Sequence, residues 1–350
     1  MSIFKLTPVC KDYIWGGTAL IEKYGKITDA MPCAESWELS LHPDGITRVG
    51  TKSINELLTE ENLGKNASDF DRFPMLVKLI DAKQNLSVQV HPSDDYALEN
   101  ENSYGKTEMW YIVEADESAG IYLGFSREVT KDEVKAAIDN NTLCDLLQFY
   151  PVKAGEAYFI PAGTVHAIGA GCLICEIQQN SNLTYRVYDY GRVGHDGKPR
   201  ELHVEKALAV MSLTPYCKNS LPSGLLGISK YFTVRKITVD KNTELKIDPS
   251  SFKGFTVVTG NGAINGEPLK LGESIFVGAD ETVVTLSGEM DILIYEVRKY
   301  KLETKEDACG IRASLTDDLG ESILTVSAHN EKAARAKLLS ALYLTESDLI

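Results

Sequence analysis

The 350-residue sequence has no run of 18 or more apolar residues, the length that a helix needs to cross a bilayer. No membrane span is therefore expected. Residues 1–8 are too short and too polar a stretch to act as a signal peptide. Without either feature, we expect a cytoplasmic protein.

A dense basic cluster is also missing. The chain has 36 lysines and arginines against 50 aspartates and glutamates, which gives a formal net charge of −14. Nucleic acid would be repelled overall, so no nucleic-acid partner is expected. A small anionic substrate stays compatible with this charge, because one or two Lys or Arg donors in a cleft are enough to bind a phosphate group.

The seven cysteines show no disulfide framework, since their number is odd and their spacing irregular. Cys172 and Cys175 form a single C-x-x-C, whereas a zinc ribbon needs a second such pair. In a strand these two side chains would point to opposite faces. We interpret them as ordinary buried cysteines rather than as a redox or metal pair.

What the sequence does contain is a succession of short segments rich in Val, Ile, Tyr and Phe, separated by Gly, Pro, Asn and Asp turns. Such segments favour strands with a half-buried, pleated surface. The predicted strands cover residues 75–80, 86–90, 109–113, 157–160, 173–178, 232–239, 255–259, 273–277, 281–287 and 292–298.

Helical signals are fewer. Thr130 with Glu133 forms a capping box ahead of apolar residues at helical spacing. Asn330 can cap a helix that ends near Leu342. Other short helices are predicted over residues 53–63, 142–149 and 204–211.

A weak internal repeat suggests how the chain is divided. Residues 153–162 read KAGEAYFIPA and residues 270–279 read KLGESIFVGA, which predicts two β modules of similar design. The boundary falls within residues 213–223. We therefore expect a first module over 1–212, a second over 224–300 and a β-α appendage of unassigned role over 301–350.

The first polar cluster is Ser87-Val88-Gln89-Val90-His91-Pro92. Gln89 and His91 are two residues apart, so their side chains lie on the same face of a strand. They point either to solvent or together into a polar pocket. Pro92 ends the strand.

Lys106 and Glu108 share a strand face in the same way. They are either a surface ion pair of little energetic weight or a cation for phosphate beside a carboxylate for a metal ion.

The segment from Gly155 to His166 follows the pattern G-x5-P-x-G-x2-H, which resembles the second motif of the cupin superfamily. In cupins this His is a metal ligand inside a small β-barrel. Ala170 stands where the family usually has Asn, and His166 has Val283 as its counterpart in the repeat. The second module would therefore lack this ligand.

Together these clusters make a candidate site for one divalent ion. Its members are Gln89, His91, Glu108 and His166. Zinc accepts imidazole and carboxylate ligands and can keep a position open for substrate. Three of the four residues come from separate strands, so the fold must bring them together.

One more segment, EIQQNSNLTYRVYDYGR from Glu176, carries polar residues on both strand faces. A buried Arg186 would need an anionic partner. Spacing alone leaves two readings open: a structural ion pair with Asp189 or Glu176, or a functional role.

With these motifs in place, the sequence closely resembles the type I phosphomannose isomerases in their short bacterial form. The resemblance is carried, in family order, by the segments YIWGG, ESWELSLHPDG, PMLVKLIDAKQNLSVQVHP, GKTEMWYIV, IPAGTVHAIGAG, QQNSNLTYRVYDYGR and RELHVEKAL.

The resemblance implies a mainly β fold with two cupin-like, jelly-roll β-barrel modules and a few short helices. It implies one Zn²⁺ per chain and a sugar-phosphate substrate, with mannose 6-phosphate and fructose 6-phosphate interconverted through a cis-enediol. The family's metal ligands fall on Gln89, His91, Glu108 and His166, and its catalytic arginine on Arg186. Substrate-binding residues implied at matching positions are Lys106 and Ser87.

Asn182 departs from the family's usual Asp. Two other functions stay open at this point: a cupin-type metal-dependent dioxygenase, since two His and a carboxylate can hold iron, and a non-catalytic sugar-binding cupin. A monomer is expected, because closed barrels leave few exposed strand edges.

Overall fold

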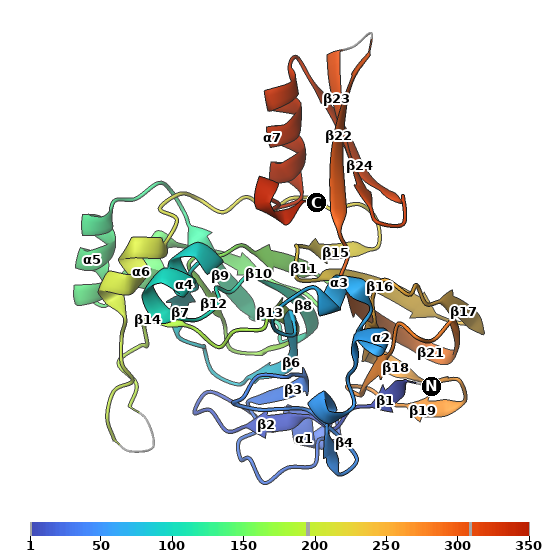
Figure 1. Ribbon diagram of the computed structural model, residues 1–350. Coiled ribbons are helices and arrows are strands. Elements are labelled where there is room, and N and C mark those ends of the chain that lie inside the picture. Colours follow the sequence, from blue (N-terminus) through green and yellow to red (C-terminus); the bar gives the residue numbers. More distant parts are fainter. Residues whose placement is uncertain (1, 194–196, 308–309, 350) are drawn as a thin grey trace. The chain divides into compact units, whose positions relative to one another are not determined.

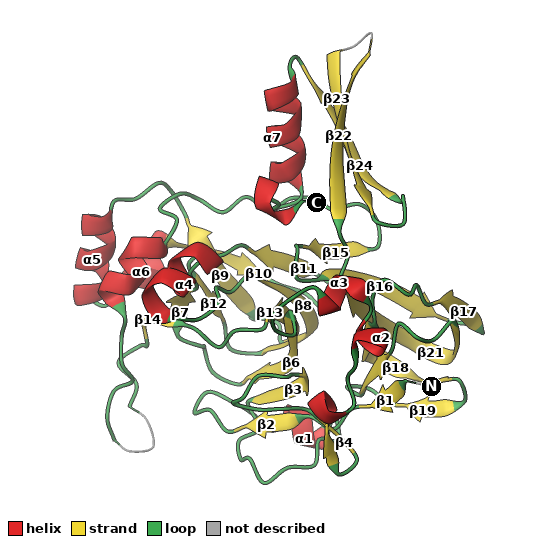
Figure 2. Ribbon diagram, in the orientation of Figure 1, coloured by secondary structure: helices red, strands yellow, loops and turns green. Residues whose placement is uncertain are grey.

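The computed structural model describes residues 2–193, 197–307 and 310–349, and it is mainly β (Figure 2). The chain forms two compact units (Figure 1). The first unit consists of Thr7–Arg48 and Met75–Cys217, and the second of the remaining described residues. No helix among the described residues is long and apolar enough to span a membrane.

The first unit is built on two antiparallel sheets. The six-stranded sheet has the order β11 (Ala157–Ile160), β8 (Glu108–Ala115), β13 (Cys172–Gln179), β6 (Met75–Ala82), β3 (Glu35–Leu39) and β2 (Val9–Lys11). The five-stranded sheet has the order β10 (Leu147–Pro151), β9 (Gly120–Phe125), β12 (His166–Ile168), β7 (Val88–Val90) and β14 (Tyr185–Tyr188). The helices of this unit are α1 (Ala19–Glu22), α4 (Asp94–Glu101), α5 (Lys131–Asp139) and α6 (Val204–Val210), with a 3₁₀ turn at Leu143–Leu146.

Two apolar clusters explain how these sheets are placed. One cluster lies between the sheets and includes Trp110 and Ile174 from the larger sheet and Ile121 from the smaller one. The other covers the opposite face of the smaller sheet, where α5 and α6 pack against Val88 and Val90. Because successive strand residues face opposite ways, β7 turns its valines to the helices and its polar residues to the space between the sheets.

The second unit contains one large sheet with the order β1 (Ile3–Lys5), β20 (Ser274–Val277), β18 (Lys253–Ile264), β21 (Val283–Glu296), β16 (Thr233–Val239) and β15 (Leu225–Ile228). β17 (Thr243–Lys246) pairs with β21, and β19 (Glu267–Leu269) with β18. Short elements of this unit are a 3₁₀ turn at Ile54–Glu56, α2 (Glu60–Leu63) and α3 (Lys65–Ser68). The hairpin β4 (Arg48–Val49) and β5 (Lys52–Ser53) stands where the chain passes from the first unit to the second.

The C-terminal residues of the second unit form a separate antiparallel sheet of β22 (Tyr300–Asp307), β23 (Gly310–Asp317) and β24 (Ser322–Ala328). Helix α7 (Glu331–Ala341) covers one face of it, and a 3₁₀ turn at Glu346–Asp348 follows. Asn330 caps α7 by accepting a hydrogen bond from the Ala333 amide at 2.8 Å, as predicted.

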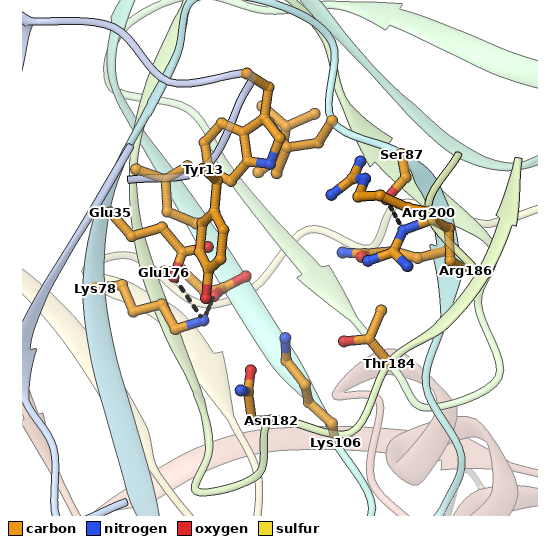
Figure 3. Close-up of a pocket in the computed structure, with 15 residues that line it drawn as sticks. Tyr13, Glu35, Lys78, Ser87, Lys106, Glu176, Asn182, Thr184, Arg186 and Arg200 are labelled. Atoms are coloured by element: carbon orange, nitrogen blue, oxygen red, sulfur yellow. Dashed lines mark hydrogen bonds and ion pairs between the residues drawn. The ribbon is translucent and has the colours of Figure 1, made fainter. Parts of the chain in front are cut away.

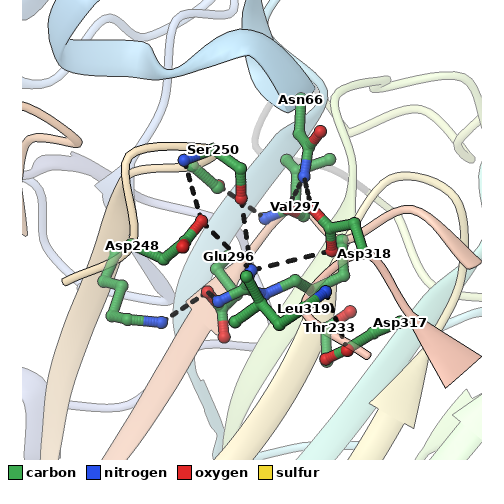
Figure 4. Close-up of polar contacts among 12 residues, drawn as sticks. Asn66, Thr233, Asp248, Ser250, Glu296, Val297, Asp317, Asp318 and Leu319 are labelled. Atoms are coloured by element: carbon green, nitrogen blue, oxygen red, sulfur yellow. Dashed lines mark hydrogen bonds and ion pairs between the residues drawn. The ribbon is translucent and has the colours of Figure 1, made fainter. Parts of the chain in front are cut away.

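A buried ion network joins this C-terminal sheet to the large sheet (Figure 4). The guanidinium of Arg298 lies 2.7 Å from Glu296, 3.5 Å from Asp248 and 3.6 Å from Asp318. Arg298 is only 5% exposed, so its charge depends on these carboxylates rather than on water. Asp318 also accepts a hydrogen bond from Asn66 at 2.6 Å.

The two copies of the internal repeat form the same type of turn. In both copies the lysine amide donates to the glutamate three residues on at 2.9 Å, in Lys153–Glu156 and in Lys270–Glu273. The intervening glycines have positive φ, and each turn leads into a short strand. The counterpart of His166, Val283, is 43% exposed. The pairings of the described strands leave the sheets open, so two closed barrels stay a prediction.

Most predicted strands are confirmed. Two predicted helices and one pair of predicted strands are corrected. The helix predicted over 53–63 is two short turns, because Ser53 and Thr59 each form their own capping box. The helix predicted over 142–149 is a 3₁₀ turn followed by β10, which pairs with β9. The strands predicted at 281–287 and 292–298 belong to the single strand β21, which continues through Gly288, where φ is 103°.

Candidate active site

Three buried side chains of the first unit meet between its two sheets. They are His91, which follows β7, Glu108 at the start of β8 and His166 at the start of β12. Their ligand atoms all lie within 4.8 Å of one another, and each residue is at most 1% exposed. Glu108 lies 3.5 Å from His91 Nε2 and 3.3 Å from His166 Nε2. This is the one group of its kind found in the described ranges.

Local structure fixes how the two imidazoles face the cluster. His91 Nδ1 lies 2.9 Å from the carbonyl of Leu183, and His166 Nδ1 lies 2.8 Å from the carbonyl of Thr164. A carbonyl can only accept, so each Nδ1 carries the proton and each Nε2 presents its lone pair to the cluster. The Pro161-Ala162-Gly163 turn is held in place because the Gly163 amide donates to the His91 carbonyl at 2.8 Å.

The electrostatics of the cluster favour a bound cation. His91 Nε2 and both carboxylate oxygens of Glu108 are buried without a hydrogen-bond partner. Burial lowers the pKa of His166 to about 4 and, together with Lys106, holds the pKa of His91 well below its ordinary value. Burial raises the pKa of Glu108 to about 8. Two neutral imidazoles and one carboxyl group, which becomes a carboxylate when a cation displaces its proton, are the donor set that zinc prefers.

Gln89 lies beside this cluster. It is the cross-strand partner of His166 on one side and of Arg186 on the other. Its amide nitrogen is 3.3 Å from His166 Nε2. To offer its oxygen to the same ion, the amide would have to rotate by half a turn, which exchanges two groups of nearly equal size.

A cavity of about 260 Å³ opens next to the cluster (Figure 3). Gln89, Lys106 and Ser87 line it, together with Tyr13, Trp15, Glu35, Lys78, Glu176, Asn182, Thr184, Arg186 and Arg200. Its charged side chains are two lysines, two arginines and two glutamates, an excess of two positive charges in a chain whose net charge is −14. This local field suits a small dianion.

Lys78 is held at one end of the cavity between two carboxylates, as Figure 3 shows. Its Nζ lies 3.3 Å from Glu35 and 3.5 Å from Glu176. Burial alone would lower the pKa of Lys78, but Glu35 and Glu176 outweigh it and raise this pKa. The lysine therefore stays charged although it is only 4% exposed. Lys106 lies 3.0 Å from Glu108 and links the cavity to the cluster.

Arg186 lines the cavity from β14. It donates to the Ser87 hydroxyl at 3.3 Å and to the carbonyl of Glu201 at 3.0 Å. Asp189, a candidate ion-pair partner of Arg186 from the sequence, pairs with Arg192 and Arg200 instead. Among the described residues no carboxylate forms an ion pair with Arg186, so the structural alternative is not what is observed.

Comparison with known proteins now decides the family. The mannose-6-phosphate isomerase of Bacillus subtilis (strain 168) is 37% identical over 290 residues, 77% of this chain and 91% of the relative. The chain belongs to the type I phosphomannose isomerase family. The mannose-6-phosphate isomerase of Streptococcus mutans is 36% identical over 264 residues, 72% of this chain and 83% of the relative.

Family models and a solved structure agree with this membership. The phosphomannose isomerase type I catalytic domain matches residues 3–106, and the mannose-6-phosphate isomerase cupin domain matches residues 225–296. The crystal structure of the mannose 6-phosphate isomerase from Bacillus subtilis has a TM-score of 0.77 and 36% identity, covering 84% of this chain and 99% of its own.

Phosphomannose isomerase motifs in the sequence led to seven site residues, and the structure brings all seven to the cluster or the cavity wall. Lys78, Glu35 and Arg200 were missed. Lys78 had a usable signal, because a lysine within the apolar run Met75-Leu76-Val77-Lys78-Leu79 is out of place unless it is paired. Arg200 opens the RELHVEKAL segment, but its contact with Asp189 could not be predicted from either segment alone.

Proposed function

We propose that the chain is a zinc-dependent aldose–ketose isomerase that interconverts mannose 6-phosphate and fructose 6-phosphate. The observation that carries this proposal is a buried His-Glu-His cluster with orphaned donor atoms beside a cavity that has two excess positive charges. The family relatives are named for this reaction, and the cavity charge suits a sugar phosphate. We also propose that each unit contains one cupin-like module and that only the first is catalytic.

Gln89, His91, Glu108 and His166 would hold the metal ion, one per chain. When bound, zinc would supply a Lewis acid that polarises the oxygens on the reacting carbons. The orphaned Nε2 of His91 and the oxygens of Glu108 fit this role, since ligand atoms of His91, Glu108 and His166 lie within 4.8 Å of one another.

The other residues would act on the substrate directly. Moving a proton between C1 and C2 through a cis-enediol places negative charge on an oxygen, and a fixed donor there lowers the barrier. Arg186 would stabilise that oxygen, because its guanidinium is half-buried and has no carboxylate partner. Lys106 and Ser87 would position the sugar chain from the cavity wall. The proton carrier is one of the groups beside the reacting carbons, among them Glu108, Lys106 and His91.

A coupled assay of mannose 6-phosphate turnover tests the proposal, with and without exhaustive chelation. We expect turnover in the purified protein, its loss after chelation and its return with added zinc. Turnover that survives complete metal removal would exclude the metal role, and absence of turnover in zinc-loaded protein would exclude the isomerase.

A further inference from the structure

Two arginines bind one buried carboxylate at the edge of the cavity, and a third arginine, Arg186, lies near them. Asp189 is 5% exposed and accepts from Arg192 Nη2 at 2.5 Å, from Arg200 Nε at 2.7 Å and from Arg200 Nη2 at 2.6 Å. Arg186 lies close enough to Arg200 that, after burial, the charge of Arg200 is the main influence lowering its pKa. Asp189 therefore pairs with two guanidinium groups, and Arg186 lies nearby without an ion pair in the part of the chain that the structure describes, so these residues carry an excess of positive charge.

The hydrogen bonds of Arg200 leave one edge of its guanidinium free. Both bonds to Asp189 use Nε and Nη2, and Nη1 has no partner among the described residues. Arg200 lines the cavity, whereas Arg192 does not and donates to the Asn85 carbonyl instead. Figure 3 shows Arg200, Arg186 and Ser87 next to one another at the end of the cavity away from Lys78. Asp189 thus orients Arg200 without using all of its donors.

The sheet register and one backbone hydrogen bond place His203, three residues after Arg200, at the far end of a row that starts at the cluster. His166, Gln89 and Arg186 are cross-strand neighbours on β12, β7 and β14. β14 is an edge strand, and beyond it the His203 amide donates to the Arg186 carbonyl at 2.7 Å. With neighbouring strands about 5 Å apart, the segment that carries Arg200 starts roughly 15 Å from β12. Its side chain reaches back to the cavity wall.

We propose that Arg200, oriented by Asp189, binds the phosphate group of the substrate, so that the reacting carbons lie at the opposite end, beside His91, Glu108 and His166. This assignment rests on the proposed isomerase function and names the residue that recognises the phosphorylated substrate. An open-chain hexose 6-phosphate carries its carbonyl and its phosphate at opposite ends, as the row from His166 to Arg200 requires. Guanidinium binds phosphate through parallel N–H donors, which Lys cannot reproduce.

The same geometry selects against the unphosphorylated sugar. A neutral hexose would leave the free edge of Arg200 and the guanidinium of Arg186, which has no ion-pair partner among the described residues, desolvated beside each other, which is unfavourable in a half-buried site. A phosphate dianion supplies the missing charge. Discrimination between the two sugars thus comes from a group that the neutral one cannot satisfy.

The test is the affinity of the zinc-loaded protein for inorganic phosphate, measured by calorimetry in Arg200→Gln and in the matched variant Arg192→Gln. Both variants remove an arginine from Asp189, but only Arg200 faces the cavity. We expect Arg200→Gln to weaken phosphate binding on the order of 10- to 100-fold, as for loss of a charge-assisted hydrogen bond, and Arg192→Gln to bind as the unaltered protein does. Equal losses in both variants, or no loss in Arg200→Gln, would overturn the proposal.

A kinetic measurement separates this proposal from the isomerase proposal. For mannose 6-phosphate we expect Arg200→Gln to raise KM far more than it lowers kcat, and the conservative Arg200→Lys to restore only part of the affinity. A fall in kcat with unchanged KM would place Arg200 at the reacting carbons and refute the phosphate role. If the unaltered protein binds phosphate but isomerises nothing, the isomerase proposal fails while the phosphate site stands.

Discussion

Replacing Glu108 by Gln should make the metal-free protein more stable while weakening its metal site. Glu108 is fully buried, and burial raises its pKa from 4.5 to about 8. Between these two pH values the native state keeps a proton that the unfolded chain releases. The free energy of unfolding therefore falls as pH rises from 4.5 towards 8, by about 1.4 kcal/mol per pH unit.

At pH 7 this single carboxyl thus destabilises the native state by about 3 kcal/mol. Gln has nearly the same shape and does not titrate, so Glu108→Gln should recover most of that amount. Its advantage should shrink as pH falls and vanish near 4.5. Burial lowers the pKa of His91 and of His166, so both imidazoles are neutral in either native protein at pH 6 and above, and their contribution cancels there.

Urea denaturation in the presence of a chelator, at pH 5, 6, 7 and 8, measures this difference directly. The same urea denaturations with added zinc test the metal site. Zinc should raise the free energy of unfolding strongly in the unaltered protein and little in the variant, because a deprotonated carboxylate is the ligand that zinc needs. If chelated Glu108→Gln is less stable at pH 7, or if the difference does not grow with pH, Glu108 is not a destabilised buried acid.

Three further predictions concern other parts of the chain. Arg186→Ala should lower kcat for mannose 6-phosphate on the order of 100-fold or more, as for loss of a donor to a developing oxyanion; near-normal turnover in the coupled assay would remove its catalytic role. Thr130→Ala should lower the free energy of unfolding by about 1 kcal/mol, because the Thr130 side chain caps α5 through the Glu133 amide; Lys131→Ala, just inside the helix, is the control that should change little in urea denaturation. Arg298→Ala should lower the free energy of unfolding by about 1–3 kcal/mol, since Glu296 loses its guanidinium partner but keeps its ion pair with Lys253; a loss below about 1 kcal/mol would show that water already solvates this network.

The strands that carry the site could be predicted from sequence, because their information is local. Gln89 and His91 alternate with valines, and the Pro161–Gly163 turn fixes where β12 begins. Alternation predicts which face each side chain occupies, and the structure places them accordingly.

What could not be predicted depends on contacts between different segments of the chain. Lys78 remains charged because Glu35 and Glu176 lie beside it, and no local pattern links these three residues. Arg200 is oriented by Asp189 through side-chain bonds rather than through any strand or helix. The helix predicted over 142–149 was wrong for a similar reason, since pairing with β9 overrides a weak local preference at β10.

The alternation of apolar and polar side chains along β7 has a consequence for how this protein folds. Val88 and Val90 belong to the apolar cluster under α5 and α6, while Ser87, Gln89 and His91 face the other way. Were this strand to slip by one position, both valines would enter the polar cavity and the three polar side chains would be forced against the helices. A molecule misassembled here would lose its apolar packing and its metal donors together, so the same register secures both the stability of the first unit and its working centre.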